Sequence, residues 1–155
     1  MNIFILDTDT KKCAKDHVDR HVTKMCVEYA QLLCSAHWCT ESKLDIPYKL
    51  SHKNHPCSIW TRDCIENYLW LCGLGMDLCE EYTNRYGKKH KSQLVIEWCL
   101  LNPPNLVTNG DLTPQPKAMP DEYKVDDVVE SYRNYYRGGK KNILVWKNGH
   151  KPEWL

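Results

Sequence analysis

The segment Asp16–His37, with the sequence DHVDRHVTKMCVEYAQLLCSAH, decides the fold of this chain. Between Met25 and Cys34 it is apolar apart from Glu28 and Gln31, a pattern typical of a helix that is buried over most of its circumference. A carboxylate is costly to bury alone, so Glu28 must be paired or protonated. The segment therefore predicts a central helix that carries an acidic group in apolar surroundings.

The polar residues of this helix form one stripe. At about 100° per residue, six of them fall in a band about 80° wide: His17, His21, Lys24, Glu28, Gln31 and Ser35. Two interpretations of Glu28 remain open: a buried ion pair that fixes helix packing, and an acid/base group held ready by His21 and Lys24. His17 and His21 also have the spacing of a metal pair, but no third ligand is recognisable, so we expect no metal or other cofactor.

The composition indicates one globular domain. The chain has 155 residues, 42% of them hydrophobic and 26% charged, which is enough to form a core and argues against disorder. The net charge is only +1, so the molecule as a whole does not attract nucleic acid strongly. Residues 131–155, however, contain six Lys or Arg and one Glu, a local net charge of +5. No apolar run reaches membrane-spanning length, so we expect no membrane association, and we expect a monomer.

The nine cysteines indicate free thiols. Their number is odd, no CxxC pair occurs, and the first residues do not form a signal peptide, so we expect a reducing compartment such as the cytoplasm. Four of them recur at intervals of seven, eight and seven residues, which predicts a buried stripe on one helix: Cys57, Cys64, Cys72 and Cys79.

The expected fold is mostly α, a single compact domain of about four helices. The periodicity and the end signals place these helices at residues 11–37, 56–86, 92–101 and 125–137. Residues 1–10 are expected to form an arm, either a strand or an extended segment. Residues 102–124 form a long Pro-rich loop that closes over something or is ordered by a ligand. Residues 131–155 form a basic aromatic tail.

Several residues predict where the helices begin, end and approach each other. Thr10, with Asp9 beside it, starts the first helix, and Asn54 or His55 caps the second. Gly87 ends the second helix. The two glycines inside that helix, Gly73 and Gly75, predict a bend or the close approach of another helix.

Two clusters suggest contacts with phosphate or DNA. The first is the helix start SHKNHP, where four crowded polar residues, Lys53 among them, and an arginine two turns later favour an anion site. Its expected phosphate contacts are His52, Asn54, His55 and Arg62. The second is the tail segment SYRNYYRGGKK, in which cations alternate with rings that can stack on bases. Its expected DNA contacts are Arg133, Tyr135, Tyr136, Arg137, Lys140 and Lys141. An amphipathic helix end, with its tyrosines on the core and its arginines in solvent, fits the second cluster equally well.

These pieces, in this order, resemble the bacteriophage pyrimidine-dimer DNA glycosylases of the endonuclease V type. The resemblance rests on Asp19, His21 and Glu28, on the helix that starts at NHPCSIW, and on the aromatic-basic segment YRNYYRGG. The chain is also similar to uncharacterised phage and large-virus proteins that begin MNIF-LD and carry HKNHP. For a viral protein the expected compartment is the cytoplasm or nucleus of the host cell.

The resemblance implies an all-α DNA repair enzyme that binds duplex DNA and extrudes a base. It implies that Glu28 is the catalytic carboxylate and that His21 orients it or contacts the DNA backbone. In the family the nucleophile is the α-amino group of a threonine exposed by removal of the initiator methionine. Here Asn2 is too large for efficient removal, so the amine of Met1 or that of Lys24 takes this role. Val27 and Gln31 replace the family's arginines beside the glutamate.

Three hypotheses follow. The first is a DNA N-glycosylase/AP lyase-like enzyme centred on Glu28, His21 and an amine. The second is an enzyme for a free nucleotide or a modified base, in which His52 and His55 hold phosphate and the Pro-rich loop is a lid. The third is a non-catalytic DNA-binding protein in which only the tail matters.

Overall fold

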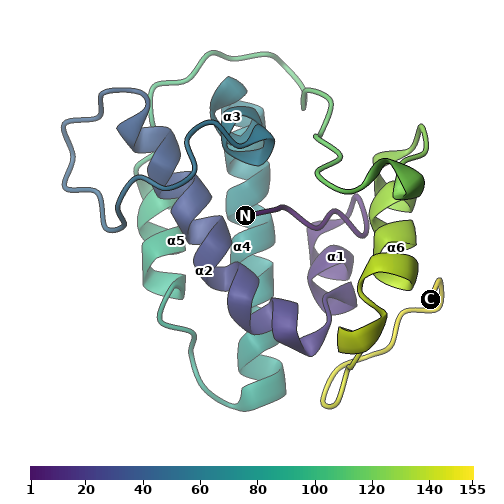
Figure 1. Ribbon diagram of the computed structural model, residues 1–155. Helices are drawn as coiled ribbons and strands as arrows, with labels where there is room; N and C mark the ends of the chain where they lie inside the picture. Colours follow the sequence, from purple (N-terminus) through teal and green to yellow (C-terminus); the bar gives the residue numbers. More distant parts are fainter.

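The structure, a computed structural model, describes residues 1–155 and consists of helices and loops without a strand (Figure 1). The α-helices are α1 (Thr10–Asp16), α2 (Asp19–Trp38), α3 (Pro56–Asp63), α4 (Ile65–Tyr86), α5 (Gln93–Leu101) and α6 (Val128–Gly139). There are two short 3₁₀ turns: η1 (Asp121–Tyr123) lies near the end of the long loop, and η2 (Lys141–Ile143) follows α6. The helical class is confirmed. The number of helices is higher than expected because two of the expected helices are each broken into two.

The first break separates α1 from α2. His17 and Val18 are extended, with ψ values of 132° and 154°, so the carbonyl groups at the end of α1 lack helical partners. The guanidinium of Arg85, from α4, supplies them: it donates to the carbonyl oxygens of Lys15 and His17, both at 2.9 Å, and to Asp19 Oδ1 at 3.0 Å. The prediction of one helix over residues 11–37 was wrong because this partner is distant in the sequence.

The second break separates α3 from α4 at Cys64, whose backbone is fully extended. Its cause is again a distant segment, because the N–H of Ile65 donates to the carbonyl of Val107 in the Pro-rich loop at 2.9 Å. Asn67 holds the same loop through two hydrogen bonds to Thr113. The loop is thus ordered by the protein itself. The four cysteines at the recurring spacing are buried as predicted, but they are divided between the two helices and the junction.

The arm at the start of the chain is part of the core. Residues Ile3 to Leu6 are at most 4% exposed and belong to neither a helix nor a strand. In Figure 1 the arm runs from the middle of the molecule towards α1 and α6. The backbone N–H of Phe4 donates to the hydroxyl of Tyr29 on α2, and Arg133 on α6 donates to the carbonyl of Leu6. The arm therefore connects α6 to the bundle formed by the other helices.

The helix ends follow the expected capping residues with one change. Asp9 caps α1 by accepting from the N–H of Lys12, whereas Thr10 is already helical and donates to Asp77. His55 caps α3, and Gly87 ends α4 with a left-handed φ of 70°. None of the helices has the length and apolarity needed to cross a bilayer.

Candidate active site

Glu28 lies between two amines. The α-amino group of Met1 is 3.6 Å from its Oε2, and Nζ of Lys24 is 3.3 Å from its Oε1. The side chain of Glu28 keeps 14% of its surface exposed, so the carboxylate is largely covered but still reaches solvent. The expectation that this acid is paired is therefore met, and one of its partners is the start of the chain.

The two amines differ in their surroundings. Lys24 precedes Glu28 by one turn of α2, and its side chain is 63% exposed. This amine therefore lies in solvent and not among apolar side chains. The side chain of Met1 is only 3% exposed, so the residue that carries the other amine is held in place by packing. Of the two candidate nucleophiles, Met1 has the more fixed position.

His21 connects three elements and makes no hydrogen bond to Glu28. The residue is 5% exposed, and its ring stacks on Phe4 of the arm, with the ring centroids 4.1 Å apart and the planes inclined by 22°. Its Nδ1 lies 2.7 Å from the hydroxyl of Tyr136 on α6. Burial, helped by the charges of His17 and nearby cations, lowers the pKa of His21 to about 2, so the ring is neutral near pH 7. It joins the central helix to the arm and to α6.

His17 is engaged in the core on the other side of the first helix break. Its ring nitrogens lie 2.7 Å from the carbonyl oxygen of Cys13 and 2.8 Å from the hydroxyl of Tyr29. Burial lowers its pKa to about 4. His17 is therefore no longer on the helical stripe with His21, and no group of three His, Cys, Asp or Glu side chains is placed to hold a metal ion.

His55 is close enough to the amine and the carboxylate to interact with both charges. Burial and the Met1 ammonium lower the pKa of His55, and the Glu28 carboxylate opposes this shift. Its Nδ1 accepts from the backbone N–H of Cys57 at 3.1 Å, which leaves the ring proton on Nε2. The start of α3 thus contributes a neutral ring with a free N–H donor to the surroundings of Glu28.

The other expected phosphate contacts are more scattered. His52 and Asn54 are exposed in the turn before α3, and the ring of His52 lies 2.6 Å from the hydroxyl of Ser51. His52 has a left-handed backbone with a φ of 48°. Arg62 lies near the far end of the helix, where it donates to Ser58. Only His52, Asn54 and His55 therefore share one end of α3.

The arginines expected to hold DNA make intramolecular contacts. Arg133 donates to the carbonyl of Leu6 at 2.9 Å and lies 3.4 Å from Asp7. Arg137 donates twice to the carbonyl of Trp154, at 3.0 and 2.7 Å, and once to Glu130. Arg133 thus attaches α6 to the arm, and Arg137 attaches the end of the chain to α6.

The aromatic residues and lysines of this segment differ in their accessibility. Tyr136 is fully buried, so its ring is not open to a base. Tyr135 is partly exposed, with Nζ of Lys140 4.9 Å from its ring centroid. Lys141 is exposed. Tyr135, Lys140 and Lys141 are the members of the predicted cluster that remain accessible.

Sequence reasoning missed the role of Asn2, which appeared only as an obstacle to methionine removal. Its amide side chain contacts three distant segments of the chain. The available signal was one amide within the apolar arm, in MNIFIL. A polar side chain in a buried segment has to find hydrogen-bond partners.

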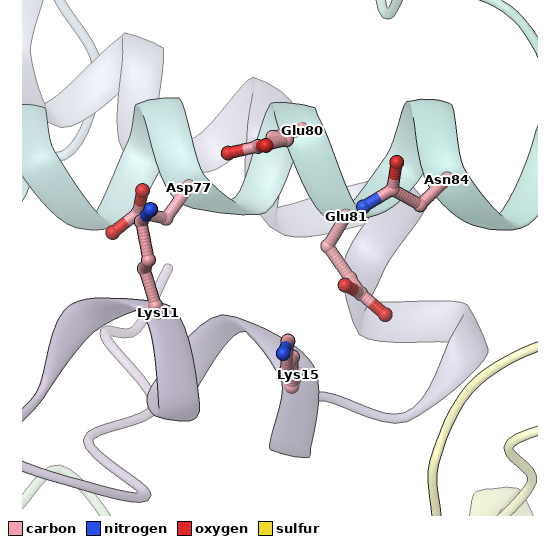
Figure 2. A pocket seen from close by; sticks show the side chains of 6 residues that line it. All are labelled: Lys11, Lys15, Asp77, Glu80, Glu81 and Asn84. Atoms are coloured by element: carbon pink, nitrogen blue, oxygen red, sulfur yellow. The ribbon is translucent and has the colours of Figure 1, made fainter.

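Two surface hollows border the central helices. Val27 and Gln31, which flank Glu28 on α2, line a hollow of about 440 Å³ that residues 47–51 close on the other side. A smaller polar pocket of about 160 Å³ lies between α1 and α4 (Figure 2). Its walls are Lys11 and Lys15 from α1 and Asp77, Glu80, Glu81 and Asn84 from α4. None of the residues expected to act in catalysis or DNA binding lines this second pocket.

Comparison with known proteins adds no relative. No protein family, curated protein or solved structure matches this chain. The likeness to the phage glycosylases therefore rests on short motifs, and the candidate active site rests on the geometry around Glu28.

Proposed function

We propose that this chain is a DNA glycosylase/AP lyase-like enzyme that acts at C1′ of a deoxyribose through the α-amino group of Met1 and the carboxylate of Glu28. The observation that carries the proposal is the 3.6 Å distance between this amine and Glu28 Oε2. An amine beside a partly covered carboxylate is the pair that imine-forming chemistry at a sugar requires.

The roles of the two groups follow from the charge changes in the reaction. The neutral amine attacks C1′, the N–C1′ bond forms, and the bond from C1′ to the base breaks as the base leaves with a proton. The C1′–O4′ bond of the sugar then breaks, and a proton moves from the amine nitrogen to O4′, which leaves the Schiff base at C1′. At an abasic site the same amine adds to the C1′ aldehyde, and water leaves. Glu28 accepts the proton that the amine must lose before attack and passes it to the departing base or hydroxyl group, which restores the carboxylate. Its negative charge then stabilises the cationic Schiff base.

The choice of Met1 over Lys24 has a physical basis. The side chain of Met1 is 3% exposed, whereas that of Lys24 is 63% exposed. The amine of Met1 therefore loses less conformational freedom on reaching the geometry of attack.

The DNA contacts of the proposal are those that remain accessible. The turn with His52, Asn54 and His55 presents side chains to a phosphate near the amine. Lys140 and Lys141, directly after α6, supply positive charge for the DNA backbone. The buried and internally paired members of the tail cluster hold α6 and the arm in place.

Borohydride trapping on DNA that contains an abasic site tests the proposal. The expected result is a covalent adduct that peptide mass spectrometry locates at residue 1 and that persists in Lys24→Ala. An adduct that disappears in Lys24→Ala would assign the chemistry to the lysine. Duplex binding with steep salt dependence but no adduct would favour a non-catalytic DNA-binding protein. Saturable nucleotide binding without duplex affinity would favour a nucleotide enzyme.

A further inference from the structure

Asn2 ties the start of the chain to three distant segments. Its Nδ2 donates to the carbonyl of Ala118 at 2.8 Å, and its Oδ1 lies 2.9 Å from the hydroxyl of Tyr132. The same oxygen accepts from the N–H of Ile3 at 2.8 Å and lies 3.6 Å from Sγ of Cys57. One amide thereby contacts the Pro-rich loop, α6 and α3.

The groups around Asn2 are suited to donate to it. Burial raises the pKa of the Cys57 thiol to about 11, so the thiol keeps its proton near pH 7. Burial also raises the pKa of Tyr132, which keeps its hydroxyl proton as well. Tyr132 shares this proton between Oδ1 of Asn2 and the carbonyl oxygen of Pro116, which is 2.8 Å away. Oδ1 of Asn2 therefore faces protonated groups on two helices, Tyr132 on α6 and Cys57 on α3.

These contacts restrict the position of the Met1 amine. Residues 3–6 are buried, and Asn2 is fixed by its own side chain. The side chain of Met1 is 3% exposed, so rotation of the first residue is limited as well. The amine, one peptide unit before the Cα of Asn2, is therefore held beside Glu28 and cannot sample solvent as a free chain end would.

We infer that Asn2 is a positioning residue, which holds the α-amino group of Met1 against Glu28 through the contacts of its amide with Ala118, Tyr132 and Cys57. The inference extends the proposed function and rests on it, because the proposed function makes this amine the nucleophile. Asn2 acts through Met1 and does not touch the substrate.

The kinetic test compares Asn2→Leu with a control variant. Leucine has a similar size and, being large, also keeps the initiator methionine, which an intact mass checks. We expect Asn2→Leu to lower kcat for abasic-site cleavage by ~10- to 100-fold with little change in KM, because a misplaced nucleophile affects chemistry more than binding. Thr10→Val removes a 2.6 Å hydrogen bond between α1 and α4 and serves as a control that loosens the fold away from Asn2.

Two further variants separate positioning from folding. Asn2→Asp keeps the acceptor Oδ1 and loses the donor to Ala118, so we expect a kcat between those of wild type and Asn2→Leu. Tyr132→Phe keeps the buried ring and removes the hydroxyl, so it remains a test even if Asn2→Leu does not fold. A kcat within about threefold of wild type in folded Asn2→Leu and Tyr132→Phe would overturn the inference.

A second readout does not depend on DNA chemistry. Reductive methylation by formaldehyde and cyanoborohydride, followed by peptide mass spectrometry, reports the reactivity of the Met1 amine separately from that of the lysines. We expect Glu28→Gln to change this rate by at least about threefold, and to leave it unchanged in an Asn2→Leu background, because the amine is then no longer held at the carboxylate.

The two readouts distinguish the possible failures. The effect of Glu28→Gln on methylation of the Met1 amine is the coupling between residues 1 and 28. If this coupling is present, depends on Asn2 and occurs without any DNA adduct, the positioning role is supported and the glycosylase proposal is overturned. Coupling that is absent, or that survives Asn2→Leu, would overturn the positioning role whatever the result on DNA.

Discussion

The α-amino group of Met1 lies 3.6 Å from Oε2 of Glu28 in the middle of α2. A chain end and a helix interior are brought together because the arm that follows Met1 is buried between α2 and α6. The carboxylate that the sequence marks as unusual thus has a partner that no helical periodicity can show. The following predictions depend on this arrangement and on the packing that produces it.

Glu28→Gln is expected to lower the rate of borohydride-trapped adduct formation by ~100- to 1000-fold, because the imine cation loses its stabilising charge. Lys24→Ala is expected to change this rate by less than about threefold, because its exposed side chain adds little to a screened pair. Both rates are measured on abasic-site DNA, with circular dichroism to confirm folding. An unfolded Glu28→Gln protein would instead identify the carboxylate as a packing element.

Lys141→Ala is expected to reduce the salt dependence of duplex binding by about one counterion, because this lysine is exposed at the end of α6. Arg137→Ala is expected to act on stability instead, since its guanidinium donates to the carbonyl of Trp154 and to Glu130. Fluorescence anisotropy over a salt series and urea unfolding separate the two effects. Equal loss of binding with unchanged stability in both variants would contradict this division.

The stability of the protein is expected to fall as the pH is lowered from about 6.5 towards 4. The folded-state pKa values of His17 and His21, about 4 and about 2, lie below the ordinary value of 6.5. In this range the unfolded chain binds protons that the folded protein does not, so each histidine costs ~1.4 kcal/mol per pH unit. Urea unfolding at several pH values measures the slope.

Variants of these histidines isolate their contribution. His17→Gln and His21→Gln should each reduce the slope of the unfolding free energy against pH, because glutamine does not titrate. The contributions of all other groups are the same as in wild type. His150→Gln, at an exposed position, serves as the control for replacing a histidine by glutamine. A slope that is the same in all four proteins would show that neither buried histidine is linked to folding.

Gly75→Ala and Gly73→Ala form a matched pair on α4. A Cβ at position 75 would lie 3.0 Å from Cδ1 and 3.3 Å from Cγ2 of the buried Ile96 on α5. A Cβ at position 73 would meet only Cγ2 of Thr10, at 4.0 Å. We expect Gly73→Ala to gain ~1 kcal/mol from helix propensity and to be at least ~1 kcal/mol more stable than Gly75→Ala. Ile96→Val should narrow the difference in stability between the two variants, because it removes Cδ1. Equal midpoints of urea unfolding for Gly73→Ala and Gly75→Ala would contradict the prediction.

Parts of the fold were predictable because they depend on neighbours in the sequence. The apolar run before Pro103 forms α5, and the signals at His55 and Gly87 mark helix ends that the structure contains. Burial of the recurring cysteines followed from their spacing in the same way. Each of these features is decided by the periodicity of a helix or by hydrogen bonds within one turn.

The two helix breaks were not predictable because each depends on a group distant in the sequence. Arg85 supplies donors to the carbonyl of His17, and Val107 supplies an acceptor to the N–H of Ile65. For the same reason the prediction of one polar stripe on α2 was only partly correct. His21 turns to Tyr136 and Phe4, whereas Glu28 turns to Met1.

The sequence alone determined that this protein is helical, where most helices end, and that Glu28 needs a partner, since these follow from local geometry and from the cost of burying a charge. Only the tertiary structure decided which partner that is. The position of Met1 depends on the contacts of Asn2 with Ala118 and Tyr132, and on the burial of the arm that follows. Such contacts form only when the whole chain has folded, because their energy comes from groups that the local sequence does not bring together.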